Sequence, residues 1–245
     1  MSRRVLGPLF NTSAILVGGV LGFTVRDRLT LRQESYLKIG LAVFAIYYGL
    51  RLACLSLAGT AAHILKLSII TLVSLMVGKL IGKLFRLQSF SNRLGRRARD
   101  WVQAGIKNQK ILFGEAFLTG TILFCTAPLG MVGALADALS PNAYPYPLMI
   151  KGIMDGLATM AFARLLGPGV IFSALPVFVL QGTIYLIANQ WEGWLRMQGL
   201  LDPLLGVAGI MVFCVGLIIL ELKKVPLAEY LPALLVAPAT AWIFR

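Results

Sequence analysis

The stretch LLGVAGIMVFCVGLIIL, residues 204–220, contains no charged side chain. A helix needs about 20 mostly apolar residues to cross the hydrocarbon core of a bilayer, and this stretch with its flanks has that length. Working outward from it, the chain divides into the apolar segments 5–24, 38–57, 65–84, 111–135, 148–166, 169–188, 204–222 and 227–244. We therefore predict an all-α integral membrane protein, a single domain over residues 1–245 with a bundle of about eight (7–8) transmembrane helices.

Three prolines lie in or beside the last of these segments: Pro226, Pro232 and Pro238. Proline removes a backbone hydrogen-bond donor and kinks or breaks a helix. We expect residues 227–244 to form a broken or partly re-entrant segment rather than a straight span.

The composition excludes a soluble domain. Hydrophobic residues make up 58% of the 245 residues, charged residues make up 13%, and the mean hydropathy is +0.81. A soluble domain has about a quarter of its residues charged. The apolar excess must therefore face lipid.

Sequence signals of catalysis and of metal binding are missing. Cys54, Cys125 and Cys214 lie inside apolar segments without C-x-x-C spacing, and a lone histidine, His63, cannot complete a metal site. The chain also lacks a G-x-S-x-G elbow, an H-E-x-x-H motif and a nucleotide-binding glycine loop. We expect no catalytic residues, no metal and no cofactor, and we predict that the protein is not an enzyme.

The basic residues indicate an orientation. Most of the 23 lysines and arginines fall on one side if the loop after the first segment is cytoplasmic. They are Arg26, Arg28, Arg32, Lys38, Lys79, Lys83, Arg86, Arg93, Arg96, Arg97, Arg99, Lys107, Lys110, Arg164, Lys223 and Lys224. Cytoplasmic loops carry such an excess, so both termini are predicted to lie outside. The net charge of +13 does not indicate nucleic acid, because these residues flank membrane helices.

The polar stretch Phe85–Lys110 has a pattern of its own. Leu94, Ala98, Trp101, Val102 and Ile106 recur at helical spacing among its arginines. This pattern is typical of an amphipathic helix on a membrane interface, here the cytoplasmic one, with a solvated loop as the alternative. We expect this stretch to attract anionic lipids of the surrounding bilayer.

Two pairs of stretches suggest internal repeats. Residues 16–26 (LVGGVLGFTVR) and 76–86 (MVGKLIGKLFR) match as parallel hairpin repeats would, and residues 6–17 and 166–177 match as an inverted repeat. Apolar sequences often match by chance, so the repeats remain hypotheses. The glycine pairs in the first match, Gly18 with Gly22 and Gly78 with Gly82, have the small-xxx-small spacing that lets helices pack closely.

Ionisable groups at membrane depth are costly and indicate function. Lys151 and Asp155 are four residues apart on one predicted helix, so they share a face and can pair. Asp137 is placed to meet Lys151 across the hairpin, giving an Asp–Lys–Asp cluster near the outer mouth. Either the lysine neutralises the carboxylates and fastens the hairpin, or one carboxylate binds a cation or a proton. Gln181 and Asn11 are further candidates, because buried amides join helices or line a polar path.

Several motifs resemble a known family. They are Asn11, Gly18-Gly19 and Gly22; Phe124-Cys125, Pro128, Gly133-Ala134 and Asp137; Lys151, Asp155-Gly156, Gly167, Gly169-Val170, Ser173 and Gln181-Gly182; and Leu231-Pro232-Ala233. The chain resembles a prokaryotic group of uncharacterised multi-spanning membrane proteins, domain of unknown function 554. Ala127 and Ala138 stand where this resemblance leads us to expect glycines. The resemblance implies a bacterial inner-membrane protein and supplies no substrate.

Three functions remain open. The polar cluster, the repeats and the broken helices favour a small secondary transporter or channel for a cation or small solute. The basic stretch Phe85–Lys110 favours, as the alternative, a non-transporting membrane scaffold or assembly factor. An intramembrane enzyme is the second alternative. The sequence leaves a homo-oligomer open.

Overall fold

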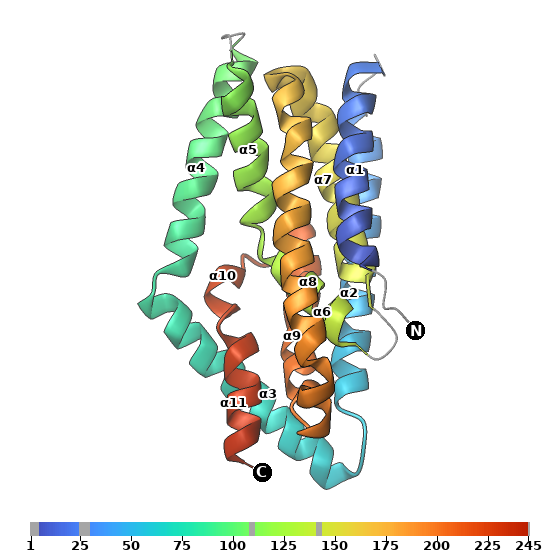
Figure 1. Ribbon diagram of the computed structural model, residues 1–245, viewed down its shortest axis with the longest axis vertical. Coiled ribbons are helices and arrows are strands. Elements are labelled where there is room, and N and C mark those ends of the chain that lie inside the picture. Colours follow the sequence, from blue (N-terminus) through green and yellow to red (C-terminus); the bar gives the residue numbers. More distant parts are fainter. Residues whose placement is uncertain (1–4, 25–29, 108–110, 141–143, 245) are drawn as a thin grey trace.

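The apolar segments fold into helices, and all secondary structure in the part of the chain that the structure describes is helical. This computed structural model describes residues 5–24, 30–107, 111–140 and 144–244. Its elements are α1 (Leu6–Thr24), α2 (Leu31–Ser56), α3 (Ala61–Leu84), α4 (Leu87–Ile106), α5 (Phe113–Cys125), α6 (Pro128–Leu139), α7 (Tyr146–Leu166), η1 (Pro168–Ser173, a 3-10 helix), α8 (Ala174–Met197), α9 (Leu201–Ile219), α10 (Leu227–Tyr230) and α11 (Ala233–Ile243) (Figure 1).

Length and apolarity identify fewer spans than the sequence predicts. Among the described residues, five helices are long and apolar enough to cross a membrane, or six if the bent pair α5–α6 counts as one span. Helix α7 has the length, but Lys151 and Asp155 make it less apolar than the five. The chain is a helical membrane protein, and the predicted seven or eight spans are not confirmed.

The predicted segment 111–135 is not one straight helix. It forms α5 and α6, whose axes differ by 56°. Pro128 begins α6, and Ala127 before it has extended backbone angles, φ −67° and ψ 118°. Proline lacks the N–H that a continuous helix needs, and it disfavours helical geometry in the preceding residue. The chain therefore breaks in the middle of the segment.

The C-terminal segment is broken, as the prolines predict. α10 ends at Tyr230, and α11 begins after Pro232. The two pieces together form only a short apolar unit. Pro238 lies inside α11 without ending it.

Glycines bring helices into backbone contact. A Cβ atom on Gly18 of α1 would lie 2.0 Å from the carbonyl oxygen of Gly156 in α7, and one on Gly22 would lie 2.6 Å from that of Met160. In α3, a Cβ atom on Gly78 would overlap the backbone of α11, and one on Gly82 would overlap the backbone of α10. The packing role predicted for these four glycines is confirmed, and it fastens α1 to α7.

The stretch predicted to be amphipathic forms α4, which runs alongside α5 rather than across the end of the bundle (Figure 1). Ala98 is fully buried, and a Cβ atom on Gly105 would lie 2.8 Å from the carbonyl oxygen of Leu165 in α7. Small residues thus let the apolar face of α4 pack on the protein. The arginines at positions 93, 96, 97 and 99 remain exposed.

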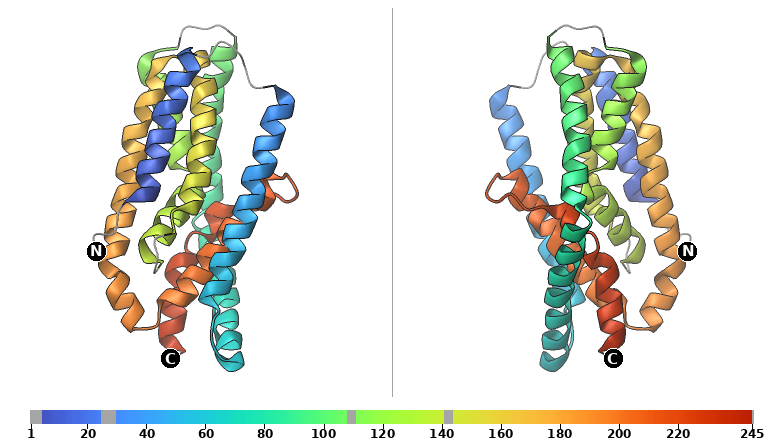
Figure 2. Two further views of the ribbon diagram at one scale, coloured as in Figure 1. Left: turned by 90° about the vertical axis from the view of Figure 1, so that its right-hand side faces the viewer. Right: turned by 90° about the vertical axis from the view of Figure 1, so that its left-hand side faces the viewer.

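The chain crosses repeatedly between two ends of an elongated bundle. The end of α1, the start of α2 and the ends of α4 and α7 lie together at the top of Figure 1. The start of α3, the start of α9 and the C-terminal end of α11 lie toward the other end (Figure 2). In the same view α2 leans away from α1 and α7 at its start. Lys107, directly after α4, and Arg164, in the last turn of α7, therefore lie at the same end of the molecule.

A methyl group at the α1–α7 contact tests this packing. Gly18→Ala should lower the stability of the protein by about 1–3 kcal/mol, because the two backbones must separate. Gly40→Ala in α2 is the matched control, since nothing lies within 4 Å of a Cβ atom there. Melting temperatures of both variants in detergent check the prediction. Equal melting temperatures would contradict the close approach.

Candidate functional site

A buried ion pair lies on α7. The Lys151 ammonium donates a hydrogen bond to the Asp155 carboxylate, one helical turn further along. The lysine side chain is 3% exposed and the aspartate side chain 11% exposed. The predicted pairing is confirmed, and it places two opposite charges inside the helix bundle.

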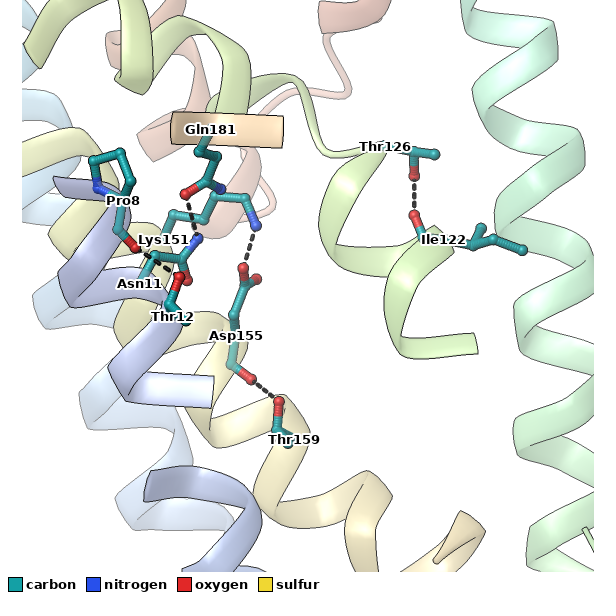
Figure 3. A network of polar contacts seen from close by, with 9 residues as sticks. All are labelled: Pro8, Asn11, Thr12, Ile122, Thr126, Lys151, Asp155, Thr159 and Gln181. Atoms are coloured by element: carbon teal, nitrogen blue, oxygen red, sulfur yellow. Dashed lines mark hydrogen bonds and ion pairs between the residues drawn. The ribbon is translucent and has the colours of Figure 1, made fainter. Parts of the chain in front are cut away.

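Amides from two other helices lie beside the pair. The Asn11 side-chain nitrogen in α1 donates to the Gln181 side-chain oxygen in α8 over 3.1 Å. Both residues are buried, at 0% and 1% exposure. Figure 3 shows these two amides gathered with Lys151 and Asp155. Four of the five predicted site residues therefore meet where α1, α7 and α8 come together.

The break between α5 and α6 borders the same cluster. The Lys151 ammonium lies 5.9 Å from the ring centroid of Phe124, and Cys125 follows Phe124 as the last residue of α5. On the other side of the break, a Cβ atom on Gly130 would lie 3.1 Å from Lys151 Cε and 3.2 Å from Gln181 Nε2. The helix discontinuity thus lies against the ion pair.

The sequence did not predict these bordering residues as part of the site. Phe124, Cys125 and Gly130 carry no charge, so a search for ionisable groups at membrane depth passes over them. The available signal was Pro128, because a proline in the middle of an apolar segment marks the place where backbone groups are released.

Asp137 does not join the cluster. Its Oδ2 atom accepts a hydrogen bond from the Gly7 backbone N–H over 2.9 Å. Among the described residues, the ion pair of Lys151 is with Asp155. The predicted meeting of Asp137 and Lys151 is therefore not observed. Lys151 lies beside Gly130, and seven further residues place Asp137 about 10 Å along α6.

One buried oxygen of the cluster, Oδ1 of Asn11, has no hydrogen-bond partner in the described part of the chain. A buried acceptor without a partner costs about 1–3 kcal/mol. The unused acceptor of Asn11 leaves the cluster able to receive one more donor.

The cluster is closed in this structure. A groove of about 430 Å³ lies between α2 and α7, and another of about 540 Å³ lies between α3, α9 and α10. Mostly apolar side chains line both, and neither lining includes Lys151 or Asp155. Within the described residues, no three His, Cys, Asp or Glu side chains gather to hold a metal ion.

The side chains of the cluster are suited to binding a polar solute. A neutral ion pair and two amides can exchange their mutual contacts for contacts with a polar solute. Such groups are costly among membrane helices, where they commonly mark solute or ion pathways. The geometry suits recognition of a charged or polar solute.

Comparisons with known proteins identify relatives along nearly the whole chain. The family described as "Protein of unknown function (DUF554)" matches residues 6–242. "Uncharacterized membrane protein YdfK" of Bacillus subtilis (strain 168) is 28% identical over 241 residues, covering 98% of this chain and 97% of the relative. "Uncharacterized protein YqgA" of Escherichia coli (strain K12) is 27% identical over 247 residues, covering 97% of each chain. No solved structure matches this chain.

Replacing one member of the ion pair should cost more than replacing both. Lys151→Gln or Asp155→Asn alone should lower stability by about 3–5 kcal/mol, because each leaves a buried charge without a partner. The double variant should recover most of that loss. Denaturation of the three variants in detergent measures the coupling.

A matched control for this series is available on α2. Lys38 and Glu34 form an ion pair of the same spacing over 2.9 Å, with side chains 57% and 49% exposed. Lys38→Gln should cost less than about 1 kcal/mol. If the Lys151 and Asp155 variants were equally mild, the buried pair would have no structural role.

Proposed function

This chain belongs to the DUF554 family of proteins of unknown function, and we propose that it is a small secondary transporter or channel for a cation or another small solute. The buried Lys151–Asp155 pair at the α5–α6 break is the observation that carries the proposal.

The position of the pair supports transport. Secondary transporters place their substrate sites near the middle of the bilayer, at helices that are interrupted there. Here α5 and α6 meet at 56° beside the pair. The 3-10 turn η1 leads directly into α8, which carries Gln181. Helix ends at such breaks leave backbone groups available to a solute.

The packing around the pair also supports movement. Gly18 and Gly22 give α1 and α7 a contact made by backbone and small groups rather than interlocked large side chains. Asn11 and Lys151 lie on these two helices, so a shift of one against the other changes the site. Transport requires such a change, because the site must open to each side in turn.

We propose a topology to go with this function. With α7 and the broken unit α10–α11 included, the chain has seven or eight membrane segments, in which the two sequence matches are internal repeats. The end of the bundle that carries Lys107 and Arg164 lies on the cytoplasmic side of a bacterial inner membrane, and both termini lie outside.

One observation favours a second function, a membrane scaffold or assembly factor. The arginines of α4 at positions 93, 96, 97 and 99 are exposed along one helix. They form a basic surface suited to anionic lipids or to an acidic partner. On this alternative the ion pair only fastens helices together.

Transport by reconstituted protein tests the two functions. In proteoliposomes, uptake of radiolabelled sodium, rubidium or alanine above the level of empty liposomes is expected. Asp155→Asn should reduce that uptake to background, because the solute loses its carboxylate partner. Unchanged flux in Asp155→Asn would remove this residue from the mechanism.

The matched control neutralises α4 instead. Replacing Arg96, Arg97 and Arg99 with glutamine leaves the cluster intact, so flux should persist. A protein that carries none of these solutes, but loses its cellular role on neutralising α4, would be a scaffold.

A further inference from the structure

We propose that the cluster binds a small zwitterion, a solute of amino-acid size that carries both an ammonium and a carboxylate group. This inference rests on the proposed transport function and names its substrate class. It follows from the charge balance of the site, from an unused acceptor and from the tight packing around the pair.

The charge balance selects the class. Lys151 and Asp155 are nearly buried, and each is the other's ion-pair partner. A cation that took Asp155 would leave the lysine ammonium buried without a counter-ion, and an anion that took Lys151 would leave the carboxylate with only the neutral Asn11 amide beside it. Removing one partner from a buried pair is strongly unfavourable. A zwitterion avoids the loss, since its two groups pair with both residues at once.

The nearest other buried acid does not change this balance. Asp137 is fully buried, and its carboxylate accepts a hydrogen bond from the Gly7 backbone N–H. It lies about 10 Å along α6 from the residue that touches Lys151. Asp137 therefore does not neutralise a lysine that has lost Asp155.

Asn11 supplies an independent observation at the ammonium side. Its Oδ1 atom is buried and has no hydrogen-bond partner among the described residues, while its nitrogen donates to Gln181 and also lies against the Asp155 carboxylate. An ammonium group has three N–H donors. One can pair with Asp155 and another can satisfy Asn11, so the same solute removes the cost of an unpaired acceptor.

The carboxylate side lies at the start of α6. Lys151 packs beside Gly130 in the first turn of that helix, which is 12 residues long. A helix N-terminus carries partial positive charge and favours an anionic group. A solute carboxylate that pairs with Lys151 would therefore also be stabilised by the partial positive charge at the start of α6.

The space limits the solute. Even a methyl group on Gly130 would lie 3.1 Å from Lys151 Cε and 3.2 Å from the Gln181 amide. Any solute at the ion pair has to displace side chains that now pack there, and a small solute displaces the fewest. We therefore choose glycine and alanine, which carry both charges on a small frame, as probes.

Binding of three matched probes to the purified full-length protein tests the proposal. Alanine carries both groups, ethylamine lacks the carboxylate, and propionate lacks the ammonium. Calorimetry should show alanine binding roughly a hundredfold more tightly than either analogue, since each analogue leaves one buried ion unpaired. Glycine should behave like alanine, and sodium or potassium chloride should not compete with it.

Single substitutions should invert the preference. In Lys151→Gln the unpaired carboxylate should favour ethylamine, and in Asp155→Asn the unpaired ammonium should favour propionate. If these variants fold poorly, the double variant Lys151→Gln/Asp155→Asn keeps the site neutral and should lose alanine binding while retaining its melting temperature.

Failure of zwitterion binding and failure of transport give different results. Asp155-dependent flux of sodium or rubidium without any response to alanine or glycine would overturn the zwitterion and leave transport standing. Equal affinity for alanine, ethylamine and propionate, or no binding of any probe, would also overturn it. Failure of every solute to cross the membrane would instead remove the proposed function.

Discussion

A lysine and an aspartate buried one turn apart on α7 constrain everything packed around them. Neither charge can be buried alone without a large cost, so the pair must stay together or exchange partners together. The groups around the pair are polar but uncharged, because amides from α1 and α8 meet beside it, so they add no charge that would compete with either partner. An arrangement this costly suits a task that apolar side chains of similar volume cannot perform.

The helix is interrupted beside the pair, at the junction of α5 and α6. Pro128 breaks a segment that would otherwise be one apolar helix, and the two pieces border Lys151 from either side of the break. Across the pair, α1 and α7 touch through glycines. The cluster therefore lies between a helix break made by proline and a helix contact made by small residues.

The sequence predicted features that depend on local patterns. Apolar length located α1, α3 and α9 to within a few residues, and four-residue spacing predicted the Lys151–Asp155 pair. Hydropathy cannot detect a bend, because both halves of a broken helix are equally apolar, so the α5–α6 break was missed. Nor does spacing reveal which backbone N–H will meet a carboxylate 130 residues away, as Gly7 meets Asp137.

Transport requires that a solute reach the ion pair from the water on each side of the membrane. Cys125, the residue after Phe124 at the pair, can report on this access in protein whose Cys54 and Cys214 are replaced by serine. The most direct measurement is the modification of Cys125 by a small, charged, membrane-impermeant thiol reagent applied to either side of sealed proteoliposomes. Modification from both sides is expected, at a rate slower than in denatured protein. No modification from either side, with full modification after denaturation, would contradict transport through this site.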